Sequence, residues 1–144
     1  MLSIQSDVAE FHRKLKVENG PQRAVRDLRE GLIIEEGTEV LCALNALDYD
    51  TPGGQKRLAK ELCDLLYVVA GTADVFGIDL EPYWREVHAS NLRKLGGSRS
   101  ATGKILKPES WVGPDLDAAY GDQFRIKGPV SNDEHRRGQY WPRP

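Results

Sequence analysis

Apolar residues recur at helical spacing along most of residues 6–95, and no stretch shows the sustained alternation of a β-strand. One long segment, residues 22–47, carries one continuous stripe at steps of three and four residues. A second long segment, residues 52–77, has the same periodicity. Helices of this kind bury their apolar faces against other helices. The pattern therefore predicts an all-α fold.

Four helices are expected, and capping residues mark the starts of three of them. The first spans about residues 6–16, with Ser6 as its candidate N-cap. The third opens at Thr51-Pro52, a capping residue followed by the proline that a first helical turn accepts. The fourth follows Asp79 and runs to about residue 95. The short turn before Thr51-Pro52 predicts that the second and third helices form an antiparallel hairpin.

The composition changes after the fourth helix. Residues 96–116 are rich in Gly, Ser and Pro, which is typical of an irregular extension. Residues 117–144 are polar and predict a tail, or an arm that lies on a neighbouring subunit. We therefore expect one helical domain at 1–116 and a separate tail at 117–144. Four helices enclose a limited interior, so at least a homodimer is expected to complete the core.

Charge and hydropathy exclude several classes of protein. The chain has 20 Lys and Arg against 22 Asp and Glu, so it lacks the basic excess of a nucleic-acid-binding protein. It has no apolar run of roughly 18–20 residues and no N-terminal signal-peptide pattern, so we expect a cytoplasmic protein with no membrane partner. Cys42 and Cys63 lack C-x-x-C spacing and are expected to be reduced thiols in the core.

Two groups of acidic residues interrupt the apolar stripes of the second and third helices. The first group is E-E-x-x-E at Glu35, Glu36 and Glu39. The second is E-x-x-D at Glu61 and Asp64. A turn of about 100° per residue places each group on one side of its helix, so a hairpin allows the two groups to face each other. Four or five carboxylates at one site would repel one another and resist burial.

A divalent cation would relieve this repulsion. An all-oxygen site without Cys or His favours Mg²⁺, or Mn²⁺ in its place, over Zn²⁺, and Mg²⁺ is commonly bound by carboxylates together with substrate phosphates. The alternative is that these acids form the solvated face of two surface helices, because E-x-x-E occurs by chance in many helices. Their position beside Leu32, Ala43 and Leu65 on the apolar stripes argues against that alternative.

In these motifs the chain resembles the MazG-like, all-α nucleoside triphosphate pyrophosphohydrolases, which include phosphoribosyl-ATP pyrophosphohydrolase and helical dUTPases. The family signature is E-x-x-E, a variable spacer and E-x-x-D, and the four matching acids here are Glu36, Glu39, Glu61 and Asp64. Asn91 and Lys94, in HASNLRKL, are similar to the family's N-x-x-K. The segments GKILKP and PDL resemble a C-terminal extension of short, often phage-encoded members. The likeness covers about residues 6–116.

The resemblance implies a four-helix, oligomeric MazG-like fold that converts a (d)NTP to the (d)NMP and pyrophosphate in nucleotide-pool control. It implies Mg²⁺ held by the four signature acids. Glu35 either reaches a further ion or positions the attacking water, or it is a solvated acid. The Asn91 amide suits sugar or base contacts and the Lys94 ammonium suits phosphate, although both also fit a polar helix end. Lys104 and Lys107 in the extension either reach phosphates or are solvated lysines.

Two other functions stay open. A phosphoribosyl-ATP pyrophosphohydrolase carries the same acid signature. A non-catalytic helical interaction module would keep the helices, but the intact acids at all four positions argue against it. No motif encodes the preferred base or sugar, the number of metal ions, or the choice between homodimer and homotetramer. If the chain is phage-encoded, the expected compartment is the host cytoplasm.

Overall fold

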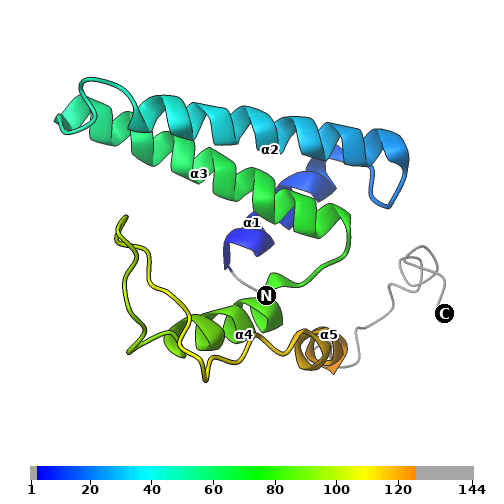
Figure 1. Ribbon diagram of the computed structural model, residues 1–144. Coiled ribbons are helices and arrows are strands. Elements are labelled where there is room, and N and C mark those ends of the chain that lie inside the picture. Colours follow the sequence, from blue (N-terminus) through cyan, green and yellow to red (C-terminus); the bar gives the residue numbers. More distant parts are fainter. Residues whose placement is uncertain (1–2, 126–144) are drawn as a thin grey trace. The chain divides into compact units, whose positions relative to one another are not determined.

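The computed structural model describes residues 3–125, and its regular elements in that range are helices apart from one isolated β-bridge (Figure 1). The five helices are α1 (Ser3–Leu15), α2 (Arg23–Leu44), α3 (Pro52–Val75), α4 (Leu80–Leu92) and α5 (Leu116–Arg125). The prediction of an all-α fold is confirmed. Within the described residues the chain divides into two compact units, residues 3–78 and residues 79–125.

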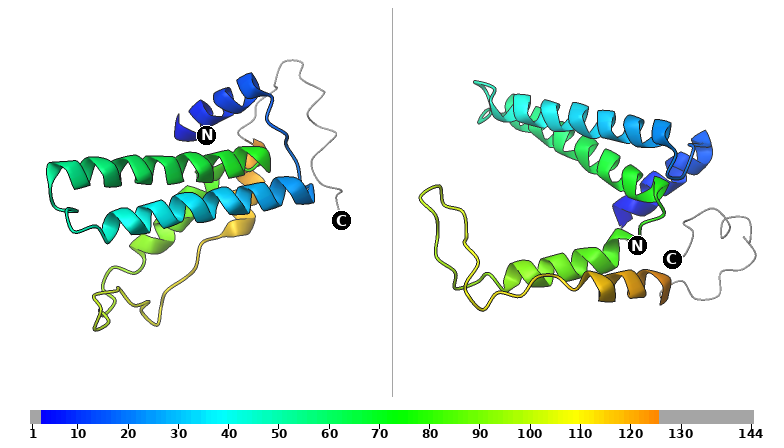
Figure 2. Two further views of the ribbon diagram at one scale, coloured as in Figure 1. Left: turned by 90° about the horizontal axis from the view of Figure 1, so that it is seen from above. Right: turned by 45° about the vertical axis from the view of Figure 1, so that its right-hand side comes forward.

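The first unit is built on a long hairpin in which α2 and α3 lie side by side (Figures 1 and 2). The helix α1 packs against α3. At the turn, the Thr51 hydroxyl accepts a hydrogen bond from the Gly54 N–H at 3.1 Å and so caps α3. Arg57 donates to the Asp48 carboxylate across the same turn. The hairpin and the Thr51-Pro52 start of α3 were both predicted.

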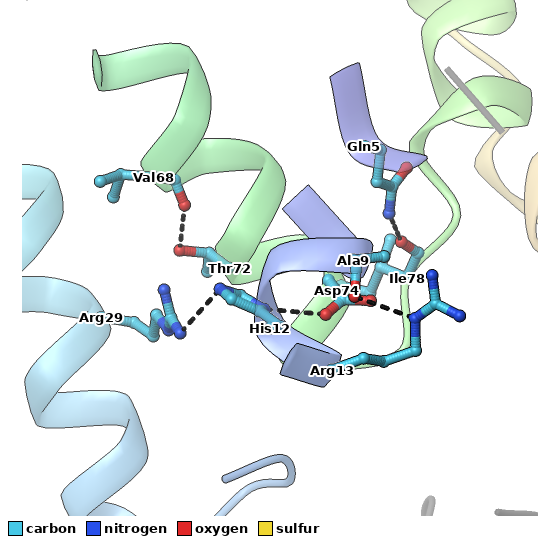
Figure 3. Close-up of polar contacts among 9 residues, drawn as sticks. All are labelled: Gln5, Ala9, His12, Arg13, Arg29, Val68, Thr72, Asp74 and Ile78. Atoms are coloured by element: carbon cyan, nitrogen blue, oxygen red, sulfur yellow. Dashed lines mark hydrogen bonds and ion pairs between the residues drawn. The ribbon is translucent and has the colours of Figure 1, made fainter. Parts of the chain in front are cut away.

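A buried polar network joins α1 to the hairpin (Figure 3). The His12 Nδ1 donates to Asp74 Oδ2 at 2.8 Å, and Arg29 Nη2 lies 3.5 Å from His12 Nε2. Because arginine only donates and a carboxylate only accepts, Nδ1 of His12 is the donor to Asp74 and Nε2 is the acceptor facing Arg29. Arg29 is only 7% exposed, and burial lowers the pKa of its guanidinium while the Asp74 charge opposes that shift. Gly71 leaves room for this network, because a Cβ there would lie 3.1 Å from His12 Cε1.

The apolar core of the first unit consists of small side chains. Its buried apolar residues are Val8, Val25, Val40, Ala43, Ala70, Ala73 and Val75. Cys42 and Cys63 are free thiols, but both are exposed, so the prediction that they lie in the core was wrong. Ala43 takes the buried position instead of Cys42, because one residue turns a helix by about 100°. Cys63 is two residues beyond the buried Glu61 and faces away for the same reason.

The second unit packs α4 against α5. Asp79 caps α4 as predicted, accepting from the Glu81 N–H at 3.1 Å, and α4 ends at Leu92. The helix α5 begins where a polar tail was expected. Its start is marked by Asp115, whose carboxylate accepts from the Ala118 N–H at 2.8 Å. The rest of the expected tail, residues 126–144, lies outside the described residues.

The start of α1 differs from the prediction, and the lengths of the helices bear on membrane spanning. Ser6 lies inside α1, which begins at Ser3, so Ser6 is not the N-cap. Among residues 3–125, no helix has both the length and the apolar character needed to span a bilayer.

Candidate functional site

Three of the predicted acids converge on the α2–α3 hairpin. Glu36 and Glu39 project from one side of α2, and Glu61 projects from α3. Each contributes a carboxylate oxygen, and these oxygens all lie within 4.8 Å of one another. Glu61 is only 8% exposed. The hairpin therefore forms an acidic cluster, defined here as Glu36, Glu39 and Glu61.

The other two predicted acids lie outside this cluster. Glu35 is exposed. It lies one residue before Glu36, and because each residue turns the helix by about 100°, its side chain projects in a different direction. Asp64 is half-buried and is connected to the cluster through Lys60. The Lys60 Nζ lies 2.8 Å from Asp64 Oδ2, 2.9 Å from Glu61 Oε2 and 3.9 Å from Glu39 Oε2. Sequence reasoning missed Lys60, although its i,i+4 spacing from Asp64 was a signal for an ion pair.

The pKa of Glu39 reflects its closeness to the other cluster carboxylates. A hydrogen bond with Glu61, and then the Glu61 charge, raise the pKa of Glu39, while Lys60 opposes the shift. Hydrogen bonds to Asp64 and Glu61 raise the pKa of the Lys60 ammonium. The site thus gathers negative charge that positive charge stabilises. Its donors are all carboxylate oxygens, which fits a hard divalent cation such as Mg²⁺ or Mn²⁺.

A cavity of about 420 Å³ adjoins the acidic cluster between α2 and α3. Its wall includes cluster carboxylates from Glu39 and Glu61 and two basic side chains, Arg57 and Lys60. The α2 side of the wall includes Thr38 and Cys42. A volume of this order accepts a small organic ligand. The cavity therefore has carboxylates that could bind a metal ion and basic side chains that could bind an anionic group of a ligand.

In the second unit, three of the four predicted substrate-contact residues gather around Trp111. The Lys94 Nζ donates to Asn91 Oδ1 at 2.6 Å and lies 5.9 Å from the Trp111 ring centroid. The Lys107 Nζ lies 3.7 Å from the same centroid. Trp111 is held by a hydrogen bond from its Nε1 to the Ser90 carbonyl at 3.0 Å. Sequence reasoning did not place Trp111 beside these lysines.

The fourth predicted residue, Lys104, is exposed and belongs to a separate turn. Its backbone N–H donates to Ser100 Oγ at 3.0 Å, and Ser100 N–H donates to the Lys104 carbonyl at 2.8 Å. These bonds stabilise the turn itself. Both bonds use backbone atoms of Lys104 and do not involve its ammonium group.

A family model described as phosphoribosyl-ATP pyrophosphohydrolase matches residues 8–91, which is more than half of the chain. The matched range includes all of α2 and α3, and with them the acidic cluster, Lys60 and Asp64. It ends at Asn91. No curated protein matches the chain.

Proposed function

The chain belongs to the phosphoribosyl-ATP pyrophosphohydrolase family, within the MazG-like all-α superfamily, and we propose that it is a divalent-metal-dependent nucleoside triphosphate pyrophosphohydrolase. Enzymes of this kind act on a phosphoric anhydride bond. The proposed reaction cleaves a (d)NTP between its α and β phosphates and gives a (d)NMP and pyrophosphate. Control of nucleotide pools is the corresponding role.

The observation that carries this proposal is the convergence of Glu36, Glu39 and Glu61 beside a ligand-sized cavity. We propose these three residues as Mg²⁺ ligands, with Asp64 as the fourth because it shares the Lys60 ammonium with Glu61. When bound, Mg²⁺ neutralises the phosphates and lowers the pKa of a water for attack on phosphorus. Mn²⁺ should substitute, because it prefers the same oxygen ligands.

Other side chains have supporting roles in this proposal. The Lys94 and Lys107 ammonium groups contact phosphate, and the Asn91 amide contacts the sugar or base. Glu35 is exposed beside Glu36, which suits positioning of water or of a further ion rather than direct membership of the cluster.

A substrate panel tests the reaction. The purified protein is incubated with the eight common NTPs and dNTPs and with phosphoribosyl-ATP, with Mg²⁺ or with EDTA, and products are identified by ³¹P NMR. We expect a nucleoside monophosphate and pyrophosphate, formed only with Mg²⁺. Nucleoside diphosphate with orthophosphate would contradict the proposed bond cleavage.

The description of the matching family model favours a second candidate, phosphoribosyl-ATP pyrophosphohydrolase itself. The same acidic cluster serves both reactions, so the panel separates them by substrate. Turnover confined to phosphoribosyl-ATP would establish the second candidate. Lack of turnover on every nucleotide would favour a non-catalytic interaction module.

A further inference from the structure

We propose that Lys60 exchanges partners during the reaction cycle: its ammonium binds the acidic cluster before metal arrives and the substrate phosphates afterwards. This inference rests on the proposed metal-dependent function. In this inference Lys60 weakens metal binding by competing for the carboxylates, and it later contacts the anionic substrate.

The contacts of Lys60 carry the first half of the inference. Its ammonium is within hydrogen-bonding distance of Glu61 Oε2 and Asp64 Oδ2, at 2.9 and 2.8 Å, and within ion-pair distance of Glu39. These three residues are proposed metal ligands. The lysine and a divalent cation therefore require the same carboxylate oxygens.

The two cations cannot use those oxygens together. Mg²⁺ binds oxygens at about 2.0–2.1 Å, which would place it within a few ångströms of the Lys60 ammonium. At that separation the two positive charges repel each other, and the singly charged Lys60 ammonium is displaced by the doubly charged metal ion. The Lys60 side chain is 63% exposed, whereas the Glu61 side chain is only 11% exposed, so the lysine can leave without disturbing the packing and the carboxylate cannot.

The second half of the inference, that Lys60 contacts the substrate phosphates, rests on the residues of the cavity wall. Lys60 lines the 420 Å³ cavity together with Glu39, Glu61 and Arg57. Arg57 is already paired with Asp48 at the hairpin turn. Displacement from the carboxylates therefore leaves Lys60 as a cation beside the metal with no competing partner among its described contacts. A flexible ammonium of this kind suits a phosphate group.

The test compares Lys60→Met with Lys56→Met. Lys56 lies one helical turn earlier, is exposed and does not line the cavity, so Lys56→Met removes the same charge from the same helix. Isothermal titration calorimetry first measures Mn²⁺ binding without any nucleotide. It then measures pyrophosphate binding to the Mn²⁺-saturated protein. Circular dichroism and the melting temperature confirm that both variants fold, and Lys60→Gln repeats the test with a polar side chain.

We expect changes of opposite sign in Lys60→Met. Mn²⁺ should bind about two- to fivefold more tightly, the upper part of the range for loss of a partly exposed ion pair. Pyrophosphate should bind about two- to fivefold more weakly, because one phosphate contact is lost. Lys56→Met should change each constant by less than about twofold, as expected for an exposed charge that contacts neither ligand.

Other outcomes overturn the inference. Weaker binding of both Mn²⁺ and pyrophosphate would indicate a structural role for Lys60. Unchanged Mn²⁺ binding would show that Lys60 does not compete with the metal, and unchanged pyrophosphate binding would show that it does not contact phosphate. Wild-type protein that binds no Mn²⁺ would overturn both the inference and the proposed function. Wild-type protein that binds Mn²⁺ but cleaves no nucleotide would contradict only the proposed function, because the Lys60 comparison needs no turnover.

Discussion

Glu61 combines the three properties that define the candidate site. Its carboxylate lies in the acidic cluster with Glu36 and Glu39, pairs with Lys60 and forms part of the cavity wall. It is also nearly buried, and burial of a carboxylate is costly unless positive charge compensates it. In the structure Lys60 supplies that positive charge, and the cost of burial is consistent with the proposed role of Glu61 as a metal ligand.

Neutral variants of the cluster test its role directly. We expect Glu61→Gln and Glu39→Gln to lower pyrophosphate release by about 100-fold or more, as removal of a group that stabilises transition-state charge does. Both should also lose most of the rise in melting temperature caused by Mn²⁺, because a ligand stabilises only the state that binds it. Enzyme assays and thermal scans with and without Mn²⁺ measure the two effects.

Glu30→Gln is the matched control, since Glu30 is an exposed acid on the same helix as Glu39. It should retain turnover and the thermal response to Mn²⁺. Near-normal values for both cluster variants would show that the acids are a solvated helix face.

The shifted pKa of Glu39 predicts a pH dependence of stability in EDTA. Glu61 raises this pKa above its ordinary value of 4.5, so the folded protein binds the Glu39 proton more tightly than the unfolded chain does. The stabilising contribution is complete below the unfolded pKa and is lost as pH rises through the folded pKa. The melting temperature of the wild type minus that of Glu39→Gln should therefore fall as the pH rises above the ordinary pKa of 4.5. A difference that stays constant or increases with pH would contradict the shift.

Sequence alone was sufficient to bring three of the five predicted acids to one site, but it did not identify their cationic partner. Helical periodicity and the short turn predict that Glu39 and Glu61 face each other, and the structure brings them together. The contact of Lys60 with both depends on the conformation of a long side chain, which no spacing rule specifies. The position of Lys107 over Trp111 likewise depends on how an irregular segment folds back on α4.

At the scale of elements, two adjacent glycines at the start of α3 differ in their surroundings. A Cβ on Gly54 would lie 2.0 Å from the Asp48 carbonyl oxygen, whereas a Cβ on Gly53 would meet nothing closer than Thr51 Oγ1 at 3.7 Å. Gly54 thus allows the close turn that sets the α2–α3 pairing.

We expect Gly54→Ala to lower the free energy of unfolding by about 2 kcal/mol or more, because the backbone must move to admit the methyl group. Gly53→Ala should be neutral or stabilising by up to about 1 kcal/mol, since alanine favours the helix. Urea denaturation of the two variants measures the difference. Equal effects would show that the turn relaxes easily around Gly54.

The His12 network makes the attachment of α1 depend on charge. Asp74→Asn leaves the buried Arg29 guanidinium without its nearby negative charge, so the free energy of unfolding should fall by at least about 2 kcal/mol. Glu10→Gln is the control, because it removes an exposed pair with Lys14 and should change stability by less than about 0.5 kcal/mol. Arg29→Met added to Asp74→Asn should restore part of the loss. Urea denaturation at neutral pH would contradict this account if Asp74→Asn matched the control.

The helices were predictable to different degrees. Capping residues and apolar stripes agree for α3 and α4, whereas α2 has no side-chain cap and is identified by its apolar stripe alone. The helix α5 has a short sequence with Gly121 in its middle, so its apolar pattern is weak. Asp115 was the available signal for its start, and the polar composition of the following residues outweighed it.

For the whole molecule, the balance of buried and exposed apolar residues favours an assembly of several copies. Among residues 3–78, the buried apolar side chains are all valines and alanines. Meanwhile Ile34, Leu41 and Leu44 are each more than half exposed, and their spacing of seven and three residues places them on one face of α2. We propose that a second copy of the chain covers this face, in a homodimer or homotetramer.

Sedimentation velocity at micromolar concentration tests that assembly. The wild type should sediment as a dimer or larger, and Leu41→Asp should raise the dissociation constant at least about tenfold, because a buried unpaired carboxylate costs more than about 1.4 kcal/mol. Leu47→Asp introduces the same charge at a fully exposed position of the hairpin turn and should leave the assembly unchanged. Equal effects of the two variants would place the interface away from this face of α2. A compact wild-type monomer with full turnover would show that one chain is sufficient for both the core and the site.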